Sequence, residues 1–435
     1  MVGAEVHLQG QNFVSASTNL SAGGPNSVVV ADVNGDDRLD LVSPDGNDGT
    51  LLVFTNKGIG GFAPAVSYKV GGGPVWVTAA DVNNDGKVDL ISANSYDNTL
   101  TVLTNNGGGV FGSNATFSVG SSPRSVITAD INGSGRLALI CANYNDNTLS
   151  VLTNNGNGVF GSNATYTVGA NPLSVNAVDI NGSGRPALIC ANFSALTLSI
   201  YTNNGNGGFA SNTAVNASVG VADNIYSVTA ADIYGNGRPA LVCADYYGRS
   251  LLVLTNNGSG RFYSNATLNA GLTLTSVAAA DLSGHGKADL IAVENYGNAL
   301  LIFTNNGGGI FNSNASYPIG NYPVAAAAAD LENDGKLDLI GVNFFGNSIS
   351  VLSNASLFQA PAYTPALAVR RSAIGMLVFW PSASAGWSLQ QNPNLTNQIW
   401  LPSGYGGFGI ADDGTNKSYA IAAALGNSFF RLTHP

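Results

Sequence analysis

Short acidic stretches recur along the chain, and the clearest of them reads DVNNDGKVD. Positions 1, 3, 5 and 9 of this stretch are Asp81, Asn83, Asp85 and Asp89, and a glycine at position 6 permits a tight turn. The backbone carbonyl of Lys87 at position 7 is a further oxygen that can face inward. Several hard oxygen ligands that converge from one short loop are what Ca²⁺ requires. The chemistry that these residues predict is calcium binding.

Seven copies of this Asp loop occur, and they differ in how many oxygen ligands they keep. Three copies are complete at positions 1, 3, 5 and 9: Asp32, Asn34, Asp36 and Asp40; Asp81, Asn83, Asp85 and Asp89; Asp330, Glu332, Asp334 and Asp338. The sixth copy keeps Asp281 and Asp289, but His285 places an imidazole where an oxygen is expected. The third to fifth copies keep one carboxylate each: Asp130, Asp179 and Asp232. We therefore expect about three calcium sites and leave the sixth loop undecided.

A metal-free interpretation of the same loops competes with the first. Asp side chains at turns also accept hydrogen bonds from nearby backbone N–H groups, and such Asx-turns need no ion. We expect metal-free Asx-turns in the third to fifth loops, because a single carboxylate poorly offsets the cost of removing water from a dication. Calcium titration distinguishes the two interpretations: about three sites agree with this assignment, whereas seven sites contradict it.

The Asp loops mark a repeat of about 49 residues. Their first Asp recurs at positions 32, 81, 130, 179, 232, 281 and 330, at intervals of 49, 49, 49, 53, 49 and 49 residues. A second marker, TNKGIGGF from Thr55 and then TNNGGGVF and its relatives, keeps the same step. Self-similarity at a fixed period indicates a repeat architecture.

Each repeat unit consists of strand and turn signals. The second unit reads VWVTAAD, VDLISAN, TLTVLTNN and NATFSVG, separated by turns rich in Asp, Asn and Gly. No window of helical period competes. Four short strands repeated seven times predict an all-β fold, a seven-bladed β-propeller. The seventh unit contains only three strands, and the N-terminal segment GQNFVSASTNLSAGG resembles the missing fourth strand, so we expect the N-terminal strand to close the last blade.

The Asp loop, the period and the G-x-F marker together resemble the FG-GAP repeat, also called the VCBS or integrin α-like repeat. The resemblance covers roughly residues 13 to 355. It implies a β-propeller whose calcium ions are bound between the first and second strands of a blade. It says little about the ligand.

The composition changes after about Gln359. We divide the chain into a propeller (1–358), a linker (359–366) and a small C-terminal β-domain (367–435). The last part contains Trp380, Trp387 and Trp400, and alternating runs such as GMLVFW predict a β-sandwich-like domain. It is similar to small C-terminal β-domains of secreted bacterial proteins, which implies a secreted or cell-surface protein. No signal peptide is visible at the N-terminus.

Composition excludes several classes of function. With 16 Lys and Arg residues and a net charge of −10, the chain has no basic patch for nucleic acid. The sequence contains no run of 18 apolar residues, so no membrane-spanning helix is predicted. We expect the protein to be a monomer. Cys141, Cys190 and Cys243 occupy equivalent frames in separate units, which favours buried free thiols over disulfides. Only three His residues occur and none of the common catalytic motifs is present.

The loops on the face opposite the Asp loops vary most between units. Aromatic side chains mixed with amides and carboxylates suit a carbohydrate or a protein loop. The candidate ligand-binding residues are Trp76, Tyr96, Arg124, Tyr144, Tyr226, Tyr246 and Tyr296. The alternative is that these aromatic side chains pack between neighbouring blades. Trp76 is the least consistent with that alternative, because most other units have Ser or Ala there.

The sequence therefore favours a calcium-stabilised extracellular binding or adhesion module that recognises a protein or a carbohydrate. A polysaccharide lyase or glycosidase is the first alternative, because related propellers host such activities. The shortage of unassigned His, Arg and paired carboxylates counts against it. A structural spacer without a ligand is the second alternative. A glycan array repeated with Trp76→Ala would separate the three.

Overall fold

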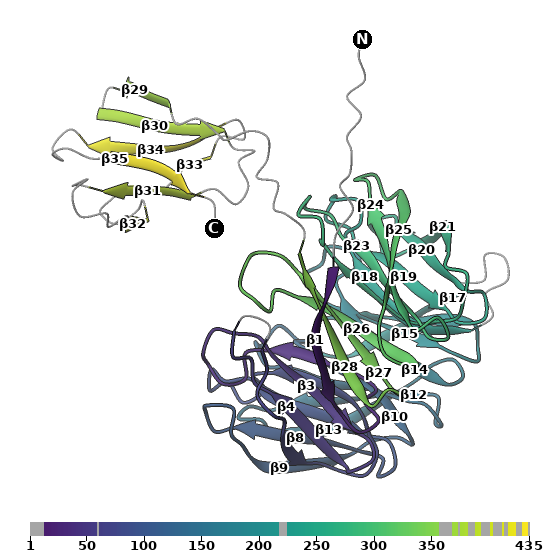
Figure 1. Ribbon diagram of the computed structural model, residues 1–435. Coiled ribbons are helices and arrows are strands. Elements are labelled where there is room, and N and C mark those ends of the chain that lie inside the picture. Colours follow the sequence, from purple (N-terminus) through teal and green to yellow (C-terminus); the bar gives the residue numbers. More distant parts are fainter. Residues whose placement is uncertain are drawn as a thin grey trace. The chain divides into compact units, whose positions relative to one another are not determined.

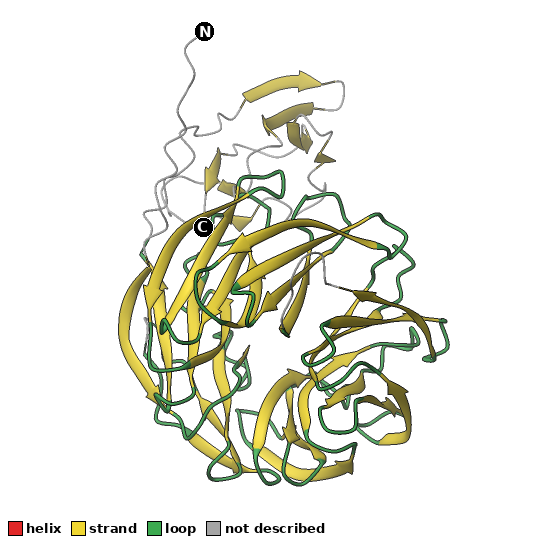
Figure 2. Ribbon diagram, turned by 90° about the vertical axis from the view of Figure 1, so that its right-hand side faces the viewer, coloured by secondary structure: helices red, strands yellow, loops and turns green. Residues whose placement is uncertain are grey.

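A computed structural model describes residues 13–58, 61–216 and 224–355, together with 368–372, 375–381, 388–392, 401–402, 411–412, 416–422 and 429–433. The chain divides into two compact units, Met1–Ser356 and Leu357–Pro435. Strands and loops make up all the segments that are described, as Figure 2 shows. Within these segments, no helix has the length and hydropathy needed to cross a membrane.

Unit 1 is a ring of seven four-stranded antiparallel sheets, the blades. The first blade contains β2 (Val29–Ala31), β3 (Asp40–Asp45), β4 (Thr50–Phe54) and β5 (Val66–Lys69). The second contains β6 (Pro74–Ala80), β7 (Asp89–Asn94), β8 (Thr99–Asn105) and β9 (Phe111–Ser118). The third contains β10 (Pro123–Ala129), β11 (Ala138–Asn143), β12 (Thr148–Asn154) and β13 (Phe160–Thr167). The fourth contains β14 (Pro172–Val178), β15 (Ala187–Asn192), β16 (Thr197–Asn203) and β17 (Phe209–Asn216).

The remaining three blades follow the same order. The fifth contains β18 (Ile225–Ala231), β19 (Ala240–Asp245), β20 (Ser250–Asn256) and β21 (Phe262–Asn269). The sixth contains β22 (Leu274–Ala280), β23 (Asp289–Glu294), β24 (Ala299–Asn305) and β25 (Phe311–Pro318). The seventh contains β26 (Pro323–Ala329), β27 (Asp338–Asn343) and β28 (Ser348–Asn354), and its fourth strand is β1 (Phe13–Ser21).

The N-terminal strand closes the ring, as predicted. β1 pairs with β28 antiparallel, with Phe13 opposite Asn354 and Ser21 opposite Ser348. Figure 1 shows β1, in purple, alongside the green β28. Because the first and last strands of the propeller belong to one sheet, the seventh blade does not leave the edge of β28 exposed. The prediction of a seven-bladed propeller is confirmed.

The core lies between neighbouring blades. The second strand of each blade is buried along its whole length, which explains its mainly apolar sequence; its few polar residues, such as Ser92 and Asn94, are buried and hydrogen-bonded. Between the second and third blades, for example, Ile91 and Leu100 pack with Val126 and Leu139 in one hydrophobic cluster. Fully burying side chains of this size stabilises the fold by about 1.5–3 kcal/mol each. Every blade therefore depends on its neighbour for its core.

The three cysteines lie in this core. Cys141, Cys190 and Cys243 are buried and unpaired, in β11, β15 and β19 respectively. Burial raises the pKa of each thiol well above its usual range. They act as small apolar side chains, in agreement with the sequence-based expectation.

Unit 2 contains two antiparallel sheets, as expected for a β-sandwich-like domain. One has the order β29-β30-β34-β33 and the other β32-β31-β35. The strands are β29 (Ala368–Ser372), β30 (Gly375–Pro381), β31 (Ser388–Asn392), β32 (Leu401–Pro402), β33 (Ala411–Asp412), β34 (Asn416–Ala422) and β35 (Phe429–Thr433). Trp380 belongs to β30, whereas Trp387, Trp400 and the linker 359–366 lie outside the described residues.

The meander gives each blade two ends. The turns between the first and second strands, and between the third and fourth, lie at one end; we call this the Asp-loop face. The turns between the second and third strands, and the joints between blades, lie at the other end, which we call the joining face. The candidate sites divide between these two faces.

Candidate functional site

The first Asp of each Asp loop accepts hydrogen bonds from its own turn. In the second blade, Asp81 Oδ2 accepts the N–H of Gly86 at 2.8 Å and Oδ1 accepts the N–H of Asp85 at 3.2 Å. The third blade has the same arrangement, with Asp130 accepting the N–H groups of Gly135 and Ser134 at 2.7 and 3.2 Å. The turn therefore has the same hydrogen bonds whether or not the other carboxylates are present.

These backbone donors stabilise the ionised form of the first Asp. Partial burial acts to raise the pKa of Asp130, Asp179 and Asp232, but several backbone N–H donors outweigh it and lower the pKa. Each carboxylate thus remains charged in its turn. The Asx-turn role expected for the third to fifth loops matches this geometry.

The Asp at position 9 has a role that the sequence did not reveal. Asp89 is fully buried, its Oδ2 accepts the N–H of Val82 at 3.1 Å, and its Oδ1 accepts the N–H of Asn105 at 2.9 Å. The carboxylate therefore ties the turn to the end of the third strand. The same two bonds are made by Asp40, Asp289 and Asp338.

Burial is the main influence on the pKa of the Asp at position 9. It raises the pKa of Asp338 to about 6, against the two backbone donors and in the same direction as the nearby Glu332 and Asp334 carboxylates. Burial likewise raises the pKa of Asp40 and Asp89. The third to fifth blades have Ala at this position and lack the bond.

An asparagine at the end of the third strand links six of the seven blades to the blade before it. Asn105 Nδ2 donates to Val88 O at 2.9 Å in its own blade and to Val33 O at 2.8 Å in the first blade. The equivalent bonds between blades are Asn56 to Leu331, Asn154 to Val82, Asn203 to Ile131, Asn256 to Ile180 and Asn305 to Ile233. The Asp-loop face thus carries a belt of bonds that fastens neighbouring blades together.

The exposed carboxylates of the three complete loops pair with a cation of the same loop. Asp36 lies 3.5 Å from Arg38, Asp85 lies 3.4 Å from Lys87, and Asp334 lies 3.3 Å from Lys336. Among the described residues, no three His, Cys, Asp or Glu side chains gather into a metal-holding cluster. The candidate ligand atoms of these loops are all oxygens, which suits calcium. A bound ion would have to replace the ion pair between the carboxylate at position 5 and its Lys or Arg.

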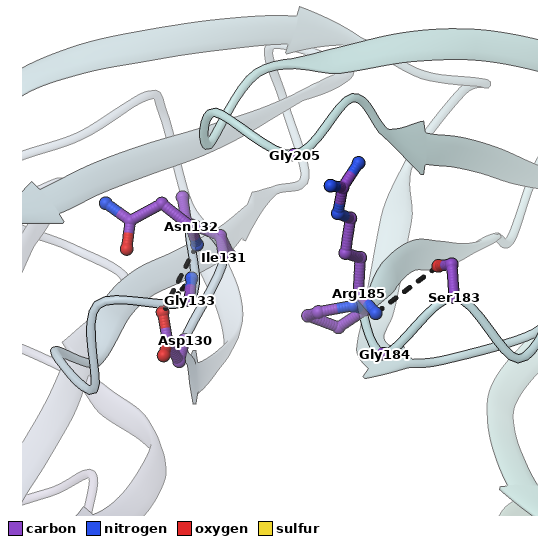
Figure 3. A pocket seen from close by; sticks show the side chains of 9 residues that line it. Asp130, Ile131, Asn132, Gly133, Ser183, Gly184, Arg185 and Gly205 are labelled. Carbon is purple, nitrogen blue, oxygen red and sulfur yellow. Dashed lines mark hydrogen bonds between the residues drawn. The ribbon is translucent and has the colours of Figure 1, made fainter.

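A pocket of about 240 Å³ lies where two carboxylate-poor loops face each other. Its lining comes from the third and fourth blades: Asp130, Ile131, Asn132, Gly133, Ser183, Gly184, Arg185, Pro186 and Gly205. Figure 3 shows Asn132 and Arg185 on opposite sides of it. Asp130 is held by its turn, and Arg185 Nη1 is 3.5 Å from Asn204 O. Both charged groups of the lining thus contact backbone groups of the loops themselves.

The joining face carries a continuous group of aromatic side chains from the fourth to seventh blades. We define this aromatic cluster as Phe193, Tyr226, Tyr246, Tyr247, Tyr296, Tyr322, Phe344 and Phe345. The Tyr226 and Tyr246 rings stack with centroids 5.7 Å apart, and the Tyr322 and Phe345 centroids are 4.4 Å apart. Burial and the neighbouring hydroxyls of Tyr296 and Tyr322 raise the pKa of Tyr246, which connects the two halves of the cluster.

The rim of the aromatic cluster is open to solvent. The exposed fraction is 58% for Tyr247, 62% for Tyr296 and 59% for Phe345. Tyr247 contacts Tyr246, and Tyr296 and Phe345 both contact Tyr322, so the three exposed rings border the same cluster. This rim is the part of the cluster that a ligand can reach.

Tyr322 occupies the centre of the cluster in a strained conformation. Its φ is +55°, a region that bulky side chains avoid at a cost of roughly 1 kcal/mol. Asn298 Oδ1 accepts the Tyr322 N–H at 2.8 Å, and the Phe344 N–H donates to Tyr322 O at 3.0 Å, so the backbone is held on both sides. The equivalent joints place Gly73, Ser122 and Asn171 at this position, also with positive φ. A tyrosine here is not required by the joint itself.

Arg124 and Tyr144 of the third blade extend the cluster. The Arg124 guanidinium carbon lies 5.4 Å from the centroid of the Tyr144 ring, a cation–π contact. Burial raises the pKa of Tyr226, the charge of Arg124 acts to lower it, and Tyr322 and Tyr144 act to raise it, so all three side chains lie within electrostatic range of Tyr226. Five predicted ligand residues therefore come together: Arg124, Tyr144, Tyr226, Tyr246 and Tyr296.

Two predicted residues, Trp76 and Tyr96, lie elsewhere on the second blade. Trp76 is half-buried and packs against the hydrophobic cluster between the second and third blades. Other blades have a serine there, such as Ser27, whose Oγ accepts the Val77 N–H at 3.1 Å. Tyr96 is 80% exposed and lies over Gly73, where a Cβ would approach its ring to 2.6 Å. Packing between blades accounts for Trp76 without a ligand.

Two central residues of the cluster, Tyr322 and Phe345, were absent from the sequence-based set. Tyr322 could have been found by aligning the joints, because it replaces the small or amide residues of other blades. Phe345 directly follows Phe344 in a turn whose other copies show no paired phenylalanines. Comparison of the repeats position by position is the signal that identifies both.

Comparison with known proteins was made against families, curated proteins and solved structures. The FG-GAP-like repeat model matches six times, over residues 41–92, 81–141, 130–190, 179–243, 232–292 and 281–341. No curated protein matches the chain.

Three of the similar solved structures differ widely in what they bind. An Agrocybe aegerita lectin that recognises non-reducing terminal N-acetylglucosamine is 24% identical, with a TM-score of 0.50 over 67% of this chain and 79% of that chain. BBS1N in complex with ARL6DN is 11% identical, with a TM-score of 0.58 over 80% and 97% of the two chains. Virginiamycin B lyase from Staphylococcus aureus, an inactive H270A form with quinupristin, is 15% identical, with a TM-score of 0.51 over 79% and 98%.

At these identities the structural neighbours show the fold alone. The repeat matches are of a different kind, because together they span most of unit 1 at the spacing of the blades. The chain belongs to the FG-GAP-like repeat family.

Proposed function

We propose that this propeller is a binding module and that its ligand, a carbohydrate or a protein, contacts the aromatic cluster on the joining face. The observation that carries the proposal is the open rim of Tyr247, Tyr296 and Phe345, which comes from three different blades. Aromatic rings with polar edges stack on the C–H faces of sugars and pack against protein side chains. The presence of Tyr322 at the centre supports the proposal, because the joint accepts Gly, Ser or Asn at this position and does not itself require an aromatic ring.

The neighbouring structures support a binding role on this fold, since one is a lectin and another a protein–protein complex. One neighbour is a lyase, so the fold is compatible with catalysis, and turnover of a polysaccharide is a separate outcome to be measured. A propeller with no ligand remains the third outcome. Fold alone does not distinguish them.

A glycan array with the full chain tests the carbohydrate form of the proposal. We expect binding to a defined set of saccharides, and a loss of at least tenfold in Tyr296→Ser. Tyr263→Ser is the matched control, because Tyr263 is also an exposed tyrosine but lies on the outer strand β21. Equal losses in both variants would refute the site. Silence of the unsubstituted protein across the array would remove the carbohydrate form, and release of reducing ends from a polysaccharide would favour a lyase or glycosidase.

We also propose that the protein works outside the cell or at its surface. FG-GAP-like repeats are typical of extracellular proteins. Immunodetection in culture medium, intact cells and lysate of the source organism tests this. Signal confined to the lysate would contradict it.

Calcium in the three complete Asp loops is a further part of the proposal. Asp85, for example, would exchange its 3.4 Å contact with Lys87 for the ion, and Asp81 and Asn83 would supply further oxygens of the same turn. Calorimetric titration of chelator-treated protein should find about three sites. Asp85→Asn should remove one of them, whereas Ser134→Ala in the carboxylate-poor third loop should remove none. Seven sites, or none, would overturn this assignment.

A further inference from the structure

Arg124 is a cation that the described protein leaves without a counter-charge. Its Nε is buried with no hydrogen-bond partner, and the described residues give it neither an ion pair nor a hydrogen bond to its other nitrogens. It lies against the face of the Tyr144 ring, and its charge acts on the Tyr226 hydroxyl. A guanidinium presents five donors in a planar fork that matches a carboxylate. An unused fork beside an aromatic surface points to an anionic group from outside the protein.

The acidic side chains of neighbouring turns are committed to other contacts. Asp97 accepts the Gly72 N–H at 2.6 Å and Asp146 accepts the Ser121 N–H at 2.6 Å, each holding its own joint. Asp245 accepts the Gly248 N–H at 2.9 Å. These carboxylates stiffen the joining face and do not neutralise Arg124. They also make its surroundings unfavourable for a ligand with many negative charges.

The side chains around Arg124 are donors and flat rings. The Tyr226 hydroxyl lies within electrostatic range of Arg124, and the Tyr246 hydroxyl is hydrogen-bonded to Tyr296 and Tyr322. A neutral phenol hydroxyl both donates and accepts hydrogen bonds. The open rings of Tyr296 and Phe345 supply apolar faces beyond them. Guanidinium, hydroxyl donors and rings together match a sugar ring with one acidic substituent.

We infer that Arg124 receives the carboxylate of a singly charged saccharide residue, of the uronic acid type, whose ring contacts the aromatic cluster. This assignment rests on the proposed function and names the ligand class for the same site. Binding forms and breaks no covalent bond. The partly buried position of the guanidinium makes the ion pair less screened than one at an exposed site.

A matched pair of sugars tests the inference. Calorimetry or ligand-observed NMR of the full chain with methyl β-D-glucuronide and methyl β-D-glucoside should give at least tenfold tighter binding of the glucuronide. Arg124→Gln should abolish this preference while changing glucoside affinity less than twofold. Arg124→Lys should keep part of the preference, which guards against a variant that merely fails to fold. Arg249→Gln is the control, because it removes the same charge from an exposed turn of the joining face and should leave the preference intact.

The remaining outcomes separate this inference from the proposed function. Equal affinity for the two sugars, with both weakened by Tyr296→Ser, would overturn the role of Arg124 and leave the aromatic site standing. Arg124-dependent binding of N-acetyl-glutamate as tight as that of the glucuronide would overturn the saccharide assignment in favour of an acidic peptide. Binding of neither sugar nor N-acetyl-glutamate would overturn the inference, and the glycan array would then decide the carbohydrate form of the proposed function separately.

Discussion

The two faces of the ring are built on different principles. On the Asp-loop face, side chains are bonded to the backbone, and the same bonds recur from blade to blade: Asp to its turn, Asn to the preceding blade. On the joining face, aromatic side chains contact one another, as Tyr246 does Tyr247 and Tyr322 does Phe345, and only some blades carry an aromatic residue at each of these positions. A bond that satisfies the backbone is needed in every blade, whereas contacts between side chains are free to diverge. The repeated face therefore supports the ring and the unrepeated face is the better place for recognition.

The third to fifth blades show which part of the repeated face is indispensable. They have lost the carboxylates at positions 5 and 9, yet they keep Asp130, Asp179 and Asp232 in the turn. They also keep the asparagine bridge, as Asn154 to Val82 shows. The turn and the bridge thus persist where the proposed metal ligands do not.

The largest expected effect on stability comes from removing a buried carboxylate of the Asp-loop face. Asp89→Ala leaves the N–H groups of Val82 and Asn105 without their acceptor, so we expect the free energy of unfolding to fall by about 3 kcal/mol. Denaturant unfolding in the presence of a chelator measures it. Asp85→Ala in the same loop is the control and should cost less than about 0.5 kcal/mol, because its ion pair is exposed. Equal costs would mean that position 9 has no special structural role.

Breaking one bridge between blades should have the next largest effect. Asn154→Ala removes the bonds to Val82 O at 2.7 Å and to Leu137 O at 3.2 Å, and we expect a loss of about 2 kcal/mol. Asn155→Ala is the matched control, because the adjacent amide is exposed. A loss in Asn154→Ala no greater than in Asn155→Ala would show that the belt contributes nothing to ring stability.

The pH dependence of stability tests the buried Asp-loop carboxylates. Burial raises the pKa of Asp338 to about 6, above its ordinary value of 3.8. Between these values the folded protein retains a proton that the unfolded chain has released, so stability falls as pH rises through 6. Without calcium we expect unfolding at pH 8 to require about 1 kcal/mol less than at pH 5, after allowance for solvent screening.

Two Asp→Asn variants and added calcium are the controls for this pH dependence of stability. Asp338→Asn should flatten the profile between pH 5 and pH 8, whereas Asp130→Asn should leave it unchanged there. The lowered pKa of Asp130 confines its contribution to more acidic conditions, where stability is lost as pH falls. If the Asp loop of the seventh blade binds calcium, excess calcium should make the free energy of unfolding rise with pH, because the ion favours ionised carboxylates. A profile that rises from pH 5 to pH 8 without calcium would contradict the prediction.

The fold was predictable because its signals are local. Each blade has an Asp turn and a buried second strand, and five blades have a TNN turn, so the 49-residue step and the matching end segments were sufficient to predict seven blades closed by β1. The role of Asp89 was not predictable in the same way. The same spacing of carboxylates and amides is found whether their oxygens bind a metal ion or accept hydrogen bonds from backbone N–H groups such as those of Val82 and Asn105.

The aromatic site was predictable only in part, because it joins residues from distant positions. Tyr226 and Tyr322 are separated by 96 positions in the sequence, and only the curvature of the ring brings them together. Trp76 illustrates the opposite case. It breaks the pattern of its repeat, but it does so by filling the space between two blades. Departure from a repeat therefore makes a residue a candidate for ligand binding only when its side chain is also open to solvent.

The smallest expected effect on stability comes from removing exposed rings of the joining face, and this experiment tests the difference between the two faces most directly. Tyr247→Ser and Phe345→Ser remove exposed rings of the joining face, and no backbone group depends on these side chains, so stability should change by less than about 0.5 kcal/mol each. Ligand binding should nevertheless fall at least tenfold. Denaturant unfolding and the glycan array measure the two quantities on the same preparations. A loss of stability comparable to that of Asn154→Ala would place the aromatic cluster among the elements that support the ring, and the division between the two faces would fail.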